Sequence, residues 1–158
     1  MAVDFFLKID TIPGESADDK HKDYIQLMSW SLGGSQVSSV AGTGGSGAGK
    51  ADLSDLSIMK YLDKSTPKLF KALVSGTHLP TGVLEAVKSG ADGKPFLKIN
   101  FEELFITSLQ HSASSEIPTE SVSFSYNKIK WDYSTQDEKG ILTSTGAVTY
   151  ELKANKVS

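Results

Sequence analysis

Alternation of apolar and polar residues is the main signal along this chain. Residues 3–10 read VDFFLKID, so every odd-numbered residue from 3 to 9 is apolar and Phe6 is the one apolar residue on the other side. Residues 24–32, YIQLMSWSL, and residues 53–62, LSDLSIMKYL, also resemble strands, with apolar residues on both faces. A half-exposed sheet in a monomer does not need two apolar faces, so we expect these segments to be covered on both sides.

One segment has the pattern of a helix. Thr66 suits the capping position, Pro67 the first helical position and Gly76 the stop. The apolar residues between them form a single stripe: Leu69, Phe70, Leu73 and Val74. The sequence therefore predicts one short helix over about 67–75 that docks by this face.

The rest of the chain reads as short strands separated by turn-like spacers. Between Val122 and Trp131 the apolar positions change from even to odd numbers, which indicates a bulge near residues 127–128. Such a bulge bends the strand or passes its apolar face from one neighbour to another. We predict a mainly β fold, an antiparallel sandwich or barrel with one helix, and a single domain over residues 1–158.

Composition narrows the classes of function. The 158 residues include no cysteine, which excludes disulfides and thiolate metal sites, and the net charge of −3 offers no polyanion footprint, so we expect no nucleic-acid partner. The N-terminal stretch carries Asp4 and Lys8 among its apolar residues, so we expect no signal peptide. No run approaches the ~20 apolar residues of a membrane helix, so we expect no membrane insertion.

A glycine-rich stretch resembles a phosphate-binding loop. Gly44, Gly49 and Lys50 have the spacing of G-x-x-x-x-G-K-[ST], but Ala51 stands where a hydroxyl would hold magnesium. The preceding SQVSSVAGT is too polar for a buried strand, and the convincing helix starts only after Thr66. The context therefore disfavours a nucleotide-hydrolysing enzyme.

No other motif carries recognisable chemistry. His21, His78 and His111 have no ligand partner at metal-site spacing, and exposed loop histidines are the simpler interpretation. The pairs Asp18-Asp19 and Glu102-Glu103 place neighbouring side chains on opposite strand faces, so neither forms a shared acid–base site. No serine stands in the G-x-S-x-G motif of a nucleophilic serine hydrolase, so polar strand faces and loops explain the serines better. We expect no catalytic, cofactor-binding or metal-binding residues.

Several long segments resemble the Hcp family, the haemolysin-coregulated proteins of bacterial type VI secretion systems. The resemblance runs from about residue 2 to residue 136, and its most specific parts are IPGES followed by DDKHKD, and KYLDKSTPKLF. It implies a compact antiparallel β-barrel of two sheets with the helix packed against it, assembled as a hexameric ring with a wide channel.

The resemblance also implies a mechanical function. Such rings stack into the inner tube of a contractile injection apparatus, with a spike protein at the tip and a contractile sheath around it. They carry effector proteins in the lumen and are themselves secreted. We therefore expect a cytoplasmic protein that is later expelled into the medium or a target cell, and no enzyme.

By the same resemblance, the long glycine-rich loop is the contact between stacked rings. Lys50 would then face an acidic group such as Asp18 or Asp19 on the next ring. Lumen or subunit contacts are expected around residues 28–32 and 98–103. The expected stacking residues are Gly42, Gly44, Gly45, Gly47, Gly49 and Lys50, and the expected lumen or subunit contacts are Phe6, Met28, Trp30 and Leu32.

One alternative comes from composition alone. A barrel with one helix can also be a monomeric carrier of small apolar ligands. The two hypotheses differ in oligomeric state, and a nucleotide hydrolase remains a distant third.

Overall fold

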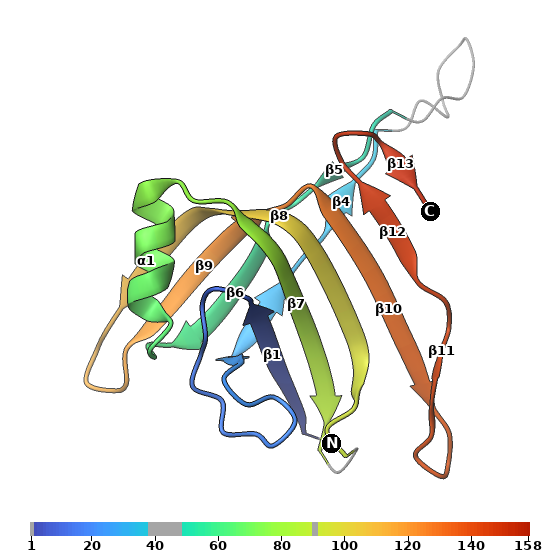
Figure 1. Ribbon diagram of the computed structural model, residues 1–158, viewed down its shortest axis with the longest axis horizontal. Helices are drawn as coiled ribbons and strands as arrows, with labels where there is room; N and C mark the ends of the chain where they lie inside the picture. Colours follow the sequence, from blue (N-terminus) through green and yellow to red (C-terminus); the bar gives the residue numbers. More distant parts are fainter. Residues whose placement is uncertain (1, 38–48, 90–91) are drawn as a thin grey trace.

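The computed structural model describes residues 2–37, 49–89 and 92–158. Figure 1 shows a β fold with one helix at its side. The elements are β1 (Val3–Ile9), β2 (Ile25–Leu27), β3 (Ser29–Ser31), β4 (Gly34–Ser35), β5 (Asp52–Leu53), β6 (Leu56–Tyr61), α1 (Thr66–Ser75), β7 (Leu79–Lys88), β8 (Pro95–Ser112), β9 (Thr119–Ser125), β10 (Lys128–Gln136), β11 (Leu142–Ser144), β12 (Val148–Glu151) and β13 (Lys156–Val157).

The strands form two antiparallel sheets that share β8. The large sheet has the order β13-β12-β10-β8-β7-β1-β2, and β11 extends the outer part of β10. The four-stranded sheet has the order β3-β6-β9-β8. A small ribbon of β4 and β5 continues beyond it. The expected mainly β, two-sheet antiparallel architecture with one short helix is confirmed.

The strand β8 passes from one sheet to the other at Glu103. Its first half pairs with β10 as far as Glu102, and its second half pairs with β9 from Phe105 onward. Glu103 has a φ of 56°, a left-handed conformation that turns the strand. Buried residues are odd-numbered before this point and even-numbered directly after it.

The segment from β9 to β10, which pairs with β8, also passes from one sheet to the other near this point. β9 ends at Ser125 in the four-stranded sheet, and β10 begins at Lys128 in the large sheet. The predicted change from even to odd apolar positions near residues 127–128 is therefore confirmed. It occurs because the chain leaves the four-stranded sheet there and enters the large sheet. Glu102 and Glu103 are both exposed at this turn.

The segment 24–32 also divides between the sheets. β2 pairs with β1 in the large sheet, and β3 pairs with β6 in the four-stranded sheet. The backbone N–H of Met28, between them, donates to the carbonyl of Met59. Apolar residues occur on both faces here because each half of the segment turns a different parity toward the core.

Helix α1 confirms the predicted position but not the predicted face. It covers Thr66–Ser75, and Gly76 ends it with a φ of 63°. The expected cap at Thr66 is wrong by one residue, because Ser65 is the N-cap and Thr66 is already helical. The buried residues are Leu69 and Ala72, with Leu73 half-buried. Phe70 and Val74, half of the expected stripe, are exposed and face away from the hydrophobic core.

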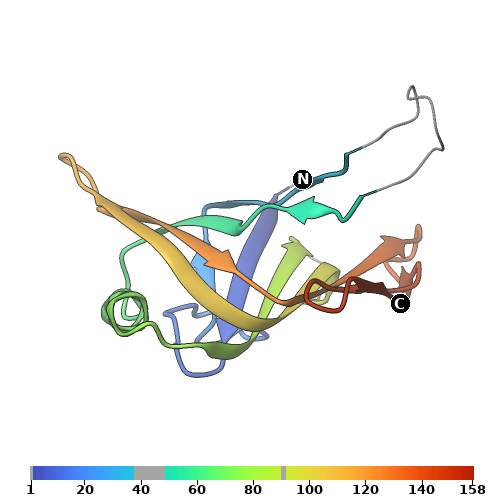
Figure 2. The ribbon, with the colours of Figure 1, turned by 90° about the horizontal axis from the view of Figure 1, so that it is seen from above.

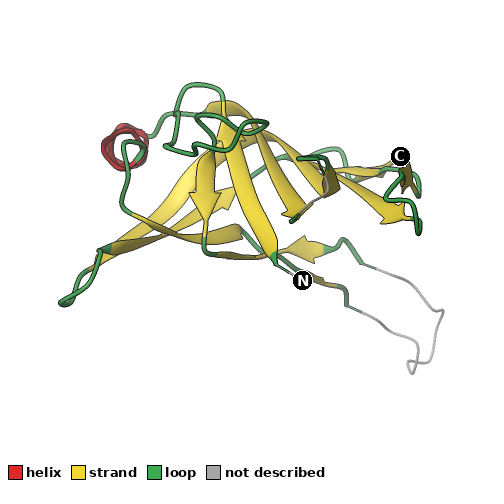
Figure 3. Cartoon of the chain, turned by 90° about the horizontal axis from the view of Figure 1, so that it is seen from below, coloured by secondary structure: helices red, strands yellow, loops and turns green. Residues whose placement is uncertain are grey.

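One hydrophobic core lies between the two sheets and under the helix (Figure 3). The large sheet contributes residues such as Leu84, Ile99 and Phe101, and the four-stranded sheet contributes Ile58 and Phe124. Leu69 of α1 belongs to the same cluster. The helix and the large sheet therefore cover the same face of the four-stranded sheet.

Candidate functional site: an uncharged sheet face and its open edges

The outer face of the four-stranded sheet carries hydroxyl groups and no charge along its paired strands. Four serines lie side by side across the sheet, because Ser31 pairs with Ser57, Ser57 with Ser123, and Ser123 with Ser108. The hydroxyls of Ser57 and Ser123 are within hydrogen-bond distance, 3.3 Å. We call this surface the serine face. Its members are Ser29, Ser31, Ser57, Met59, Tyr61, Ser108, Gln110, Ser112, Thr119, Ser121, Ser123 and Ser125.

The opposite face of the same sheet is apolar except for one row of charged residues near helix α1. The next cross-strand row joins Trp30, Ile58, Val122 and Leu109, and all four contribute to the core or pack against it. The sheet is therefore two-sided, with aliphatic and aromatic residues inside and small hydroxyls outside. The sequence carried this signal in the alternation SVSFS of residues 121–125, which reads as a polar face without saying what the face meets.

The four-stranded sheet has two open edges among the described residues. β3 pairs only with β6, so its other backbone edge has no strand partner in this part of the chain. At the far side, β7 stops pairing with β8 at Leu104, so residues 105–112 have β9 on one side only. Open edges carry unpaired N–H and C=O groups that can extend a sheet into another chain.

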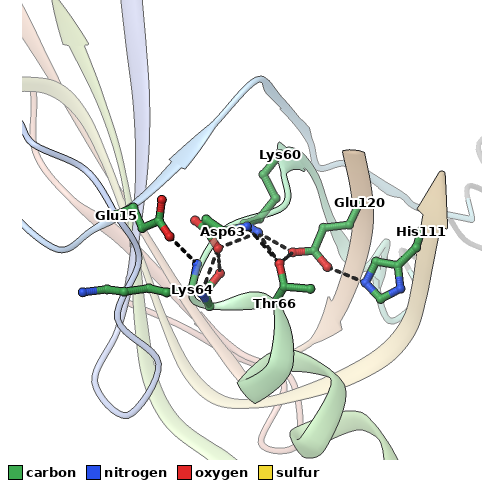
Figure 4. A network of polar contacts seen from close by, with 8 residues as sticks. Glu15, Lys60, Asp63, Lys64, Thr66, His111 and Glu120 are labelled. Atoms are coloured by element: carbon green, nitrogen blue, oxygen red, sulfur yellow. Dashed lines mark hydrogen bonds and ion pairs between the residues drawn. The ribbon is translucent and has the colours of Figure 1, made fainter. Parts of the chain in front are cut away.

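A buried polar network fixes α1 to this sheet (Figure 4). Lys60 on β6 forms an ion pair with Glu120 on β9, and neither side chain is exposed. The Nζ atom of Lys60 also lies 2.9 Å from the carboxylate of Asp63. The hydroxyl of Thr66, the first residue of α1, donates to Glu120 at 2.8 Å.

The network reaches the surface through His111. Its Nε2 atom lies 2.8 Å from the second carboxylate oxygen of Glu120. His111 sits on β8 beside Glu120 on β9, which in turn pairs with Lys60 on β6. Three strands and the helix start are thus joined by one row of charged groups. Alternation places Lys60 on the same side as Leu56 and Ile58, but it does not indicate the buried carboxylates that meet Lys60 there.

The loop between β1 and β2 covers Phe6, which corrects two expectations. The imidazole of His21 stacks on the Phe6 ring with centroids 4.3 Å apart and planes 6° apart. His21 is 2 % exposed and contacts Asp18 at 2.9 Å and Glu85 at 2.5 Å. The hydrogen bond from His21 lowers the pKa of Asp18. His21 is not an exposed loop histidine, and Phe6, which is 3 % exposed, packs inside the fold instead of at a surface that could face a lumen or a neighbour.

The other residues expected to contact the lumen or a neighbour differ in how exposed they are. Met28 is exposed, whereas Trp30 is half-buried against Phe5 and Trp131 on the core side of the sheet. Leu32 is half-buried and lines an apolar groove. The lumen or subunit role remains a prediction for Met28 and Leu32, while the packing of Trp30 is mainly internal.

The glycine-rich loop falls mostly outside the described residues. Gly42, Gly44, Gly45 and Gly47 lie there, so their stacking role stays a prediction. Gly49 and Lys50 are described and exposed just before β5. No helix follows them, because residues 52–61 form β5 and β6, and this geometry does not provide the helix N-terminus of a phosphate-binding loop.

An apolar groove of about 430 Å³ opens where β4, β5, β10, β12 and β13 meet. Leu32 and Leu53 form one wall, and Trp131, Val148 and Tyr150 form the other. The polar ends of its tyrosines are already occupied: Tyr126 donates to the carbonyl of Ser54 and Tyr150 to the side chain of Asn155. Burial raises the pKa of Tyr126 to about 12, with a smaller contribution from Asp55.

Potential metal ligands do not cluster in the described ranges. Across residues 2–37, 49–89 and 92–158, no cluster of three or more His, Asp or Glu side chains has the geometry to hold a metal ion. The helix found in these same ranges is too short to cross a membrane.

The comparisons with known proteins agree with this architecture. The family model described as "Type VI secretion system effector, Hcp" matches residues 6–133. Protein hcp1 of Pseudomonas aeruginosa is 39% identical over 143 residues, which cover 89% of this chain and 88% of that protein. The chain belongs to the Hcp family. The resemblance stated from its sequence segments is confirmed.

Solved Hcp structures share the whole fold. A structure described as a type six secretion system protein has a TM-score of 0.93 and 32% identity, covering 99% of this chain and 100% of that one. Hcp1 from Salmonella typhimurium has a TM-score of 0.81 and 35% identity, with all of both chains covered. An effector structure from Yersinia pestis has a TM-score of 0.75 and 30% identity, covering 94% of this chain and 99% of that one. The Hcp fold therefore includes both sheets and the helix.

Proposed function

We propose that this Hcp chain is a structural subunit of the type VI secretion inner tube. Six copies form a closed ring, and rings stack into the tube. The observation that carries the proposal is the pair of open edges on the four-stranded sheet, at β3 and at residues 105–112 of β8. Family membership supports the assignment to type VI secretion.

The strand directions suit ring closure. Within the four-stranded sheet each strand is antiparallel to its neighbour, so β3 and β8 at the two edges run in opposite directions. If β3 of one copy pairs with β8 of the next, the alternation continues without a break. A heterologous, head-to-tail contact of this kind closes into a ring when the rotation per subunit fits. Closure also protects both edges from uncontrolled pairing.

The serine face then lines the channel. The helix and the large sheet cover the other side of the four-stranded sheet, so they form the outside of the ring. A lining of serine, threonine and glutamine side chains offers hydrogen bonds without a fixed charge sign. Such a surface suits effector proteins of varied composition, because no cargo charge is repelled.

The remaining parts of the proposal concern partners and location. The loop that contains Gly42, Gly44, Gly45, Gly47, Gly49 and Lys50 contacts the adjoining ring. The tip spike protein and the contractile sheath are the other partners. The protein is cytoplasmic before firing and is then expelled into the medium or a target cell. Its role is mechanical, with no catalysis, cofactor or nucleic acid involved.

Light scattering of the purified protein tests the ring. We expect a mass six times the chain mass of 16.9 kDa. A strict monomer at all accessible concentrations contradicts the proposal and favours the monomeric carrier of small apolar ligands, for which the apolar groove is the available cavity.

Electron microscopy tests the orientation of the subunit. Because the chain has no cysteine, Ser57→Cys provides one labelling site on the serine face for a small gold particle. We expect the gold within the channel in end-on views. Lys68→Cys on α1 is the matched control and should place gold on the outer rim. Gold from Ser57→Cys on the rim contradicts the proposed lining.

A further inference from the structure

The serine face changes character along strand β6. The outward residues of this strand are Ser57, Met59 and Tyr61, in that order toward its end. Met59 is 42 % exposed and Tyr61 is 50 % exposed. Their neighbours across the strands are serines and a threonine. Two large, mainly apolar side chains therefore stand open on a wall that otherwise carries small hydroxyls.

Met59 lies inside the sheet and not at its border. Its neighbours across the strands are Ser29 on β3 and Ser121 on β9. Side chains of a strand stand roughly perpendicular to the sheet, so Met59 points straight out of the serine face. Tyr61 points the same way about 7 Å further along, at the ordinary rise of a strand. Both residues lie at the end of β6 that is far from the β4–β5 ribbon.

A hollow beside Tyr61 extends this apolar surface. It has a volume of about 460 Å³ and opens between β2 and the end of β6. Met28, Tyr61 and Leu62 line it, and all three are exposed. Its two carboxylates, of Glu15 and Asp63, already have partners within the subunit. We call Met28, Met59, Tyr61 and Leu62 the apolar end of the serine face.

The proposed ring leaves the apolar end uncovered. Pairing of β3 with β8 of the next copy uses backbone edges in the plane of the sheet, and α1 and the large sheet lie on the core side. Met59 already has a strand on each side within its own sheet, so a neighbouring copy does not reach over it. The space in front of it is the channel.

We propose that the apolar end binds apolar side chains of effector proteins inside the channel. This inference rests on the proposed ring and on the serine face as its lining. The effector surface that fits is a segment with several large apolar side chains on one side, such as an amphipathic helix. Methionine is flexible and polarizable, so it adapts to partners of different shape. Tyrosine adds a large contact area and a hydroxyl for hydrogen bonding.

The ring multiplies a contact that is weak in one copy. Six copies present six apolar ends at the same level of the channel, so an effector that touches several of them gains from each. The serines contribute less, because a hydrogen bond to effector replaces one to water and the net gain is small. The apolar end therefore supplies affinity, and the serines leave the wall tolerant of different effectors.

A designed peptide tests this chemistry. The probe is a fluorescein-labelled amphipathic helix of about 18 residues, built from leucine, serine and glutamine. We expect its fluorescence anisotropy to rise and saturate as the unsubstituted ring is added. Met59→Ser and Tyr61→Ser should each weaken the binding about tenfold, because less apolar surface leaves water. A peptide with serine in place of every leucine should not bind.

Three variants are the matched controls. Ile141→Ser removes a comparably exposed apolar side chain outside the serine face, and Ser121→Ala removes a hydroxyl beside Met59. Both should bind the peptide like the unsubstituted ring, and Met59→Leu should keep the binding. Light scattering checks that each variant is still a ring. Weakening by Ser121→Ala that equals that of Met59→Ser contradicts an apolar contact.

A photo-cross-link places the peptide. The chain has no cysteine, so Met59→Cys carries a single benzophenone maleimide, which should attach to the peptide on irradiation. The same label on Lys68→Cys of α1 should not. Electron micrographs of stacked rings examine the adjoining ring as the other occupant. Shorter stacks of Met59→Ser and Tyr61→Ser with unchanged peptide binding assign the apolar end to ring stacking and overturn the inference.

Two outcomes separate this inference from the proposed function. An unsubstituted ring that does not bind the peptide, or intact Met59→Ser and Tyr61→Ser rings that bind it fully, overturns the inference and leaves the ring in place. A monomeric unsubstituted protein removes both.

Discussion

Lys60 and Glu120 face each other on adjacent strands as an ion pair with no exposed side-chain surface. A buried pair of this kind costs much of its attraction in lost hydration, so its net contribution to stability is small. Breaking it is expensive, because the remaining charge is left in the core. The pair therefore makes one arrangement of β6, β9 and α1 much better than any other.

Removal of one partner tests this pair. Lys60→Met leaves Glu120 buried without its ammonium partner, and we expect the free energy of unfolding to fall by about 3–5 kcal/mol. The double variant Lys60→Met/Glu120→Leu should recover most of this loss, since no charge is left unpaired. Denaturant unfolding at one fixed protein concentration measures both. A double variant as unstable as the single one contradicts the argument.

An exposed pair is the matched control. Lys128 lies 3.7 Å from Glu102 with both side chains largely in solvent. Lys128→Met should change the free energy of unfolding by less than about 1 kcal/mol. The contrast separates the effect of burial from the loss of a lysine as such.

The stack of His21 on Phe6 gives a second prediction. His21→Ala removes the ring that covers Phe6 and leaves the buried carboxylate of Glu85 without its nearest partner. We expect a loss of about 2–4 kcal/mol in unfolding free energy, from the cavity and the unpaired group. His78→Ala, on an exposed residue after α1, should cost much less. Equal effects of the two substitutions would show that the buried stack adds no stability.

Acid should weaken the loop that holds this stack. Hydrogen bonding from His21 lowers the pKa of Asp18 below its ordinary value of 3.8. A lowered folded-state pKa stabilises the fold above the unfolded value, and this stabilisation is lost as pH falls through the folded value. Because Asp18 is largely in solvent, the effect is small. In Asp18→Asn, the part of the stability loss below pH 3.8 that comes from this group should disappear.

Alkaline pH should act through Tyr126. Its pKa is raised to about 12 from 10.0, so between these values the folded state holds a proton that the unfolded chain releases. Stability therefore falls as pH rises above 10, the ordinary value, and this loss is complete near 12. Tyr126→Phe should flatten the profile between these values, although it also loses the bond to Ser54.

Position 14 has no room for a side chain larger than that of glycine. A Cβ at this position would lie 2.5 Å from the backbone Cα atom of Ile25. Gly14→Ala must push the loop away from β2, and we expect a loss of at least 1–3 kcal/mol in unfolding free energy. Gly33→Ala is the control, because its nearest neighbour would be 4.0 Å away. A thermal melt of each variant measures the difference, and similar melting temperatures would contradict the steric argument.

Local signals in the sequence predicted the elements well. Pro67 and Gly76 delimit α1 because their backbone preferences act without help from the rest of the fold. The change of parity between Val122 and Trp131 located the crossing between sheets, because a strand that changes sheets must change its inward face. The family resemblance supplied the two-sheet arrangement, which no local pattern specifies.

Local sequence patterns could not predict contacts between residues that are far apart in the sequence. His21 stands in a charged segment that reads as solvated, and only the position of Phe6 and Glu85 on neighbouring strands makes it buried. Lys60 occupies an inward position that alternation assigns to an apolar residue. The helix stripe was misread because Phe70 and Val74 satisfy the helical period without packing on their own subunit. Apolar periodicity does not say which molecule covers an apolar face.

The strand β8 is hydrogen-bonded to β7 and β10 in one sheet and to β9 in the other, with only the turn at Glu103 between the two halves. In the proposed ring, a push on the four-stranded sheet is therefore carried to the large sheet along a covalent backbone rather than across a side-chain interface. Covalent chain does not slip under shear as packed side chains do. For a tube driven forward from behind, each subunit of the proposed ring thus has one continuous strand where thrust would otherwise separate its two layers.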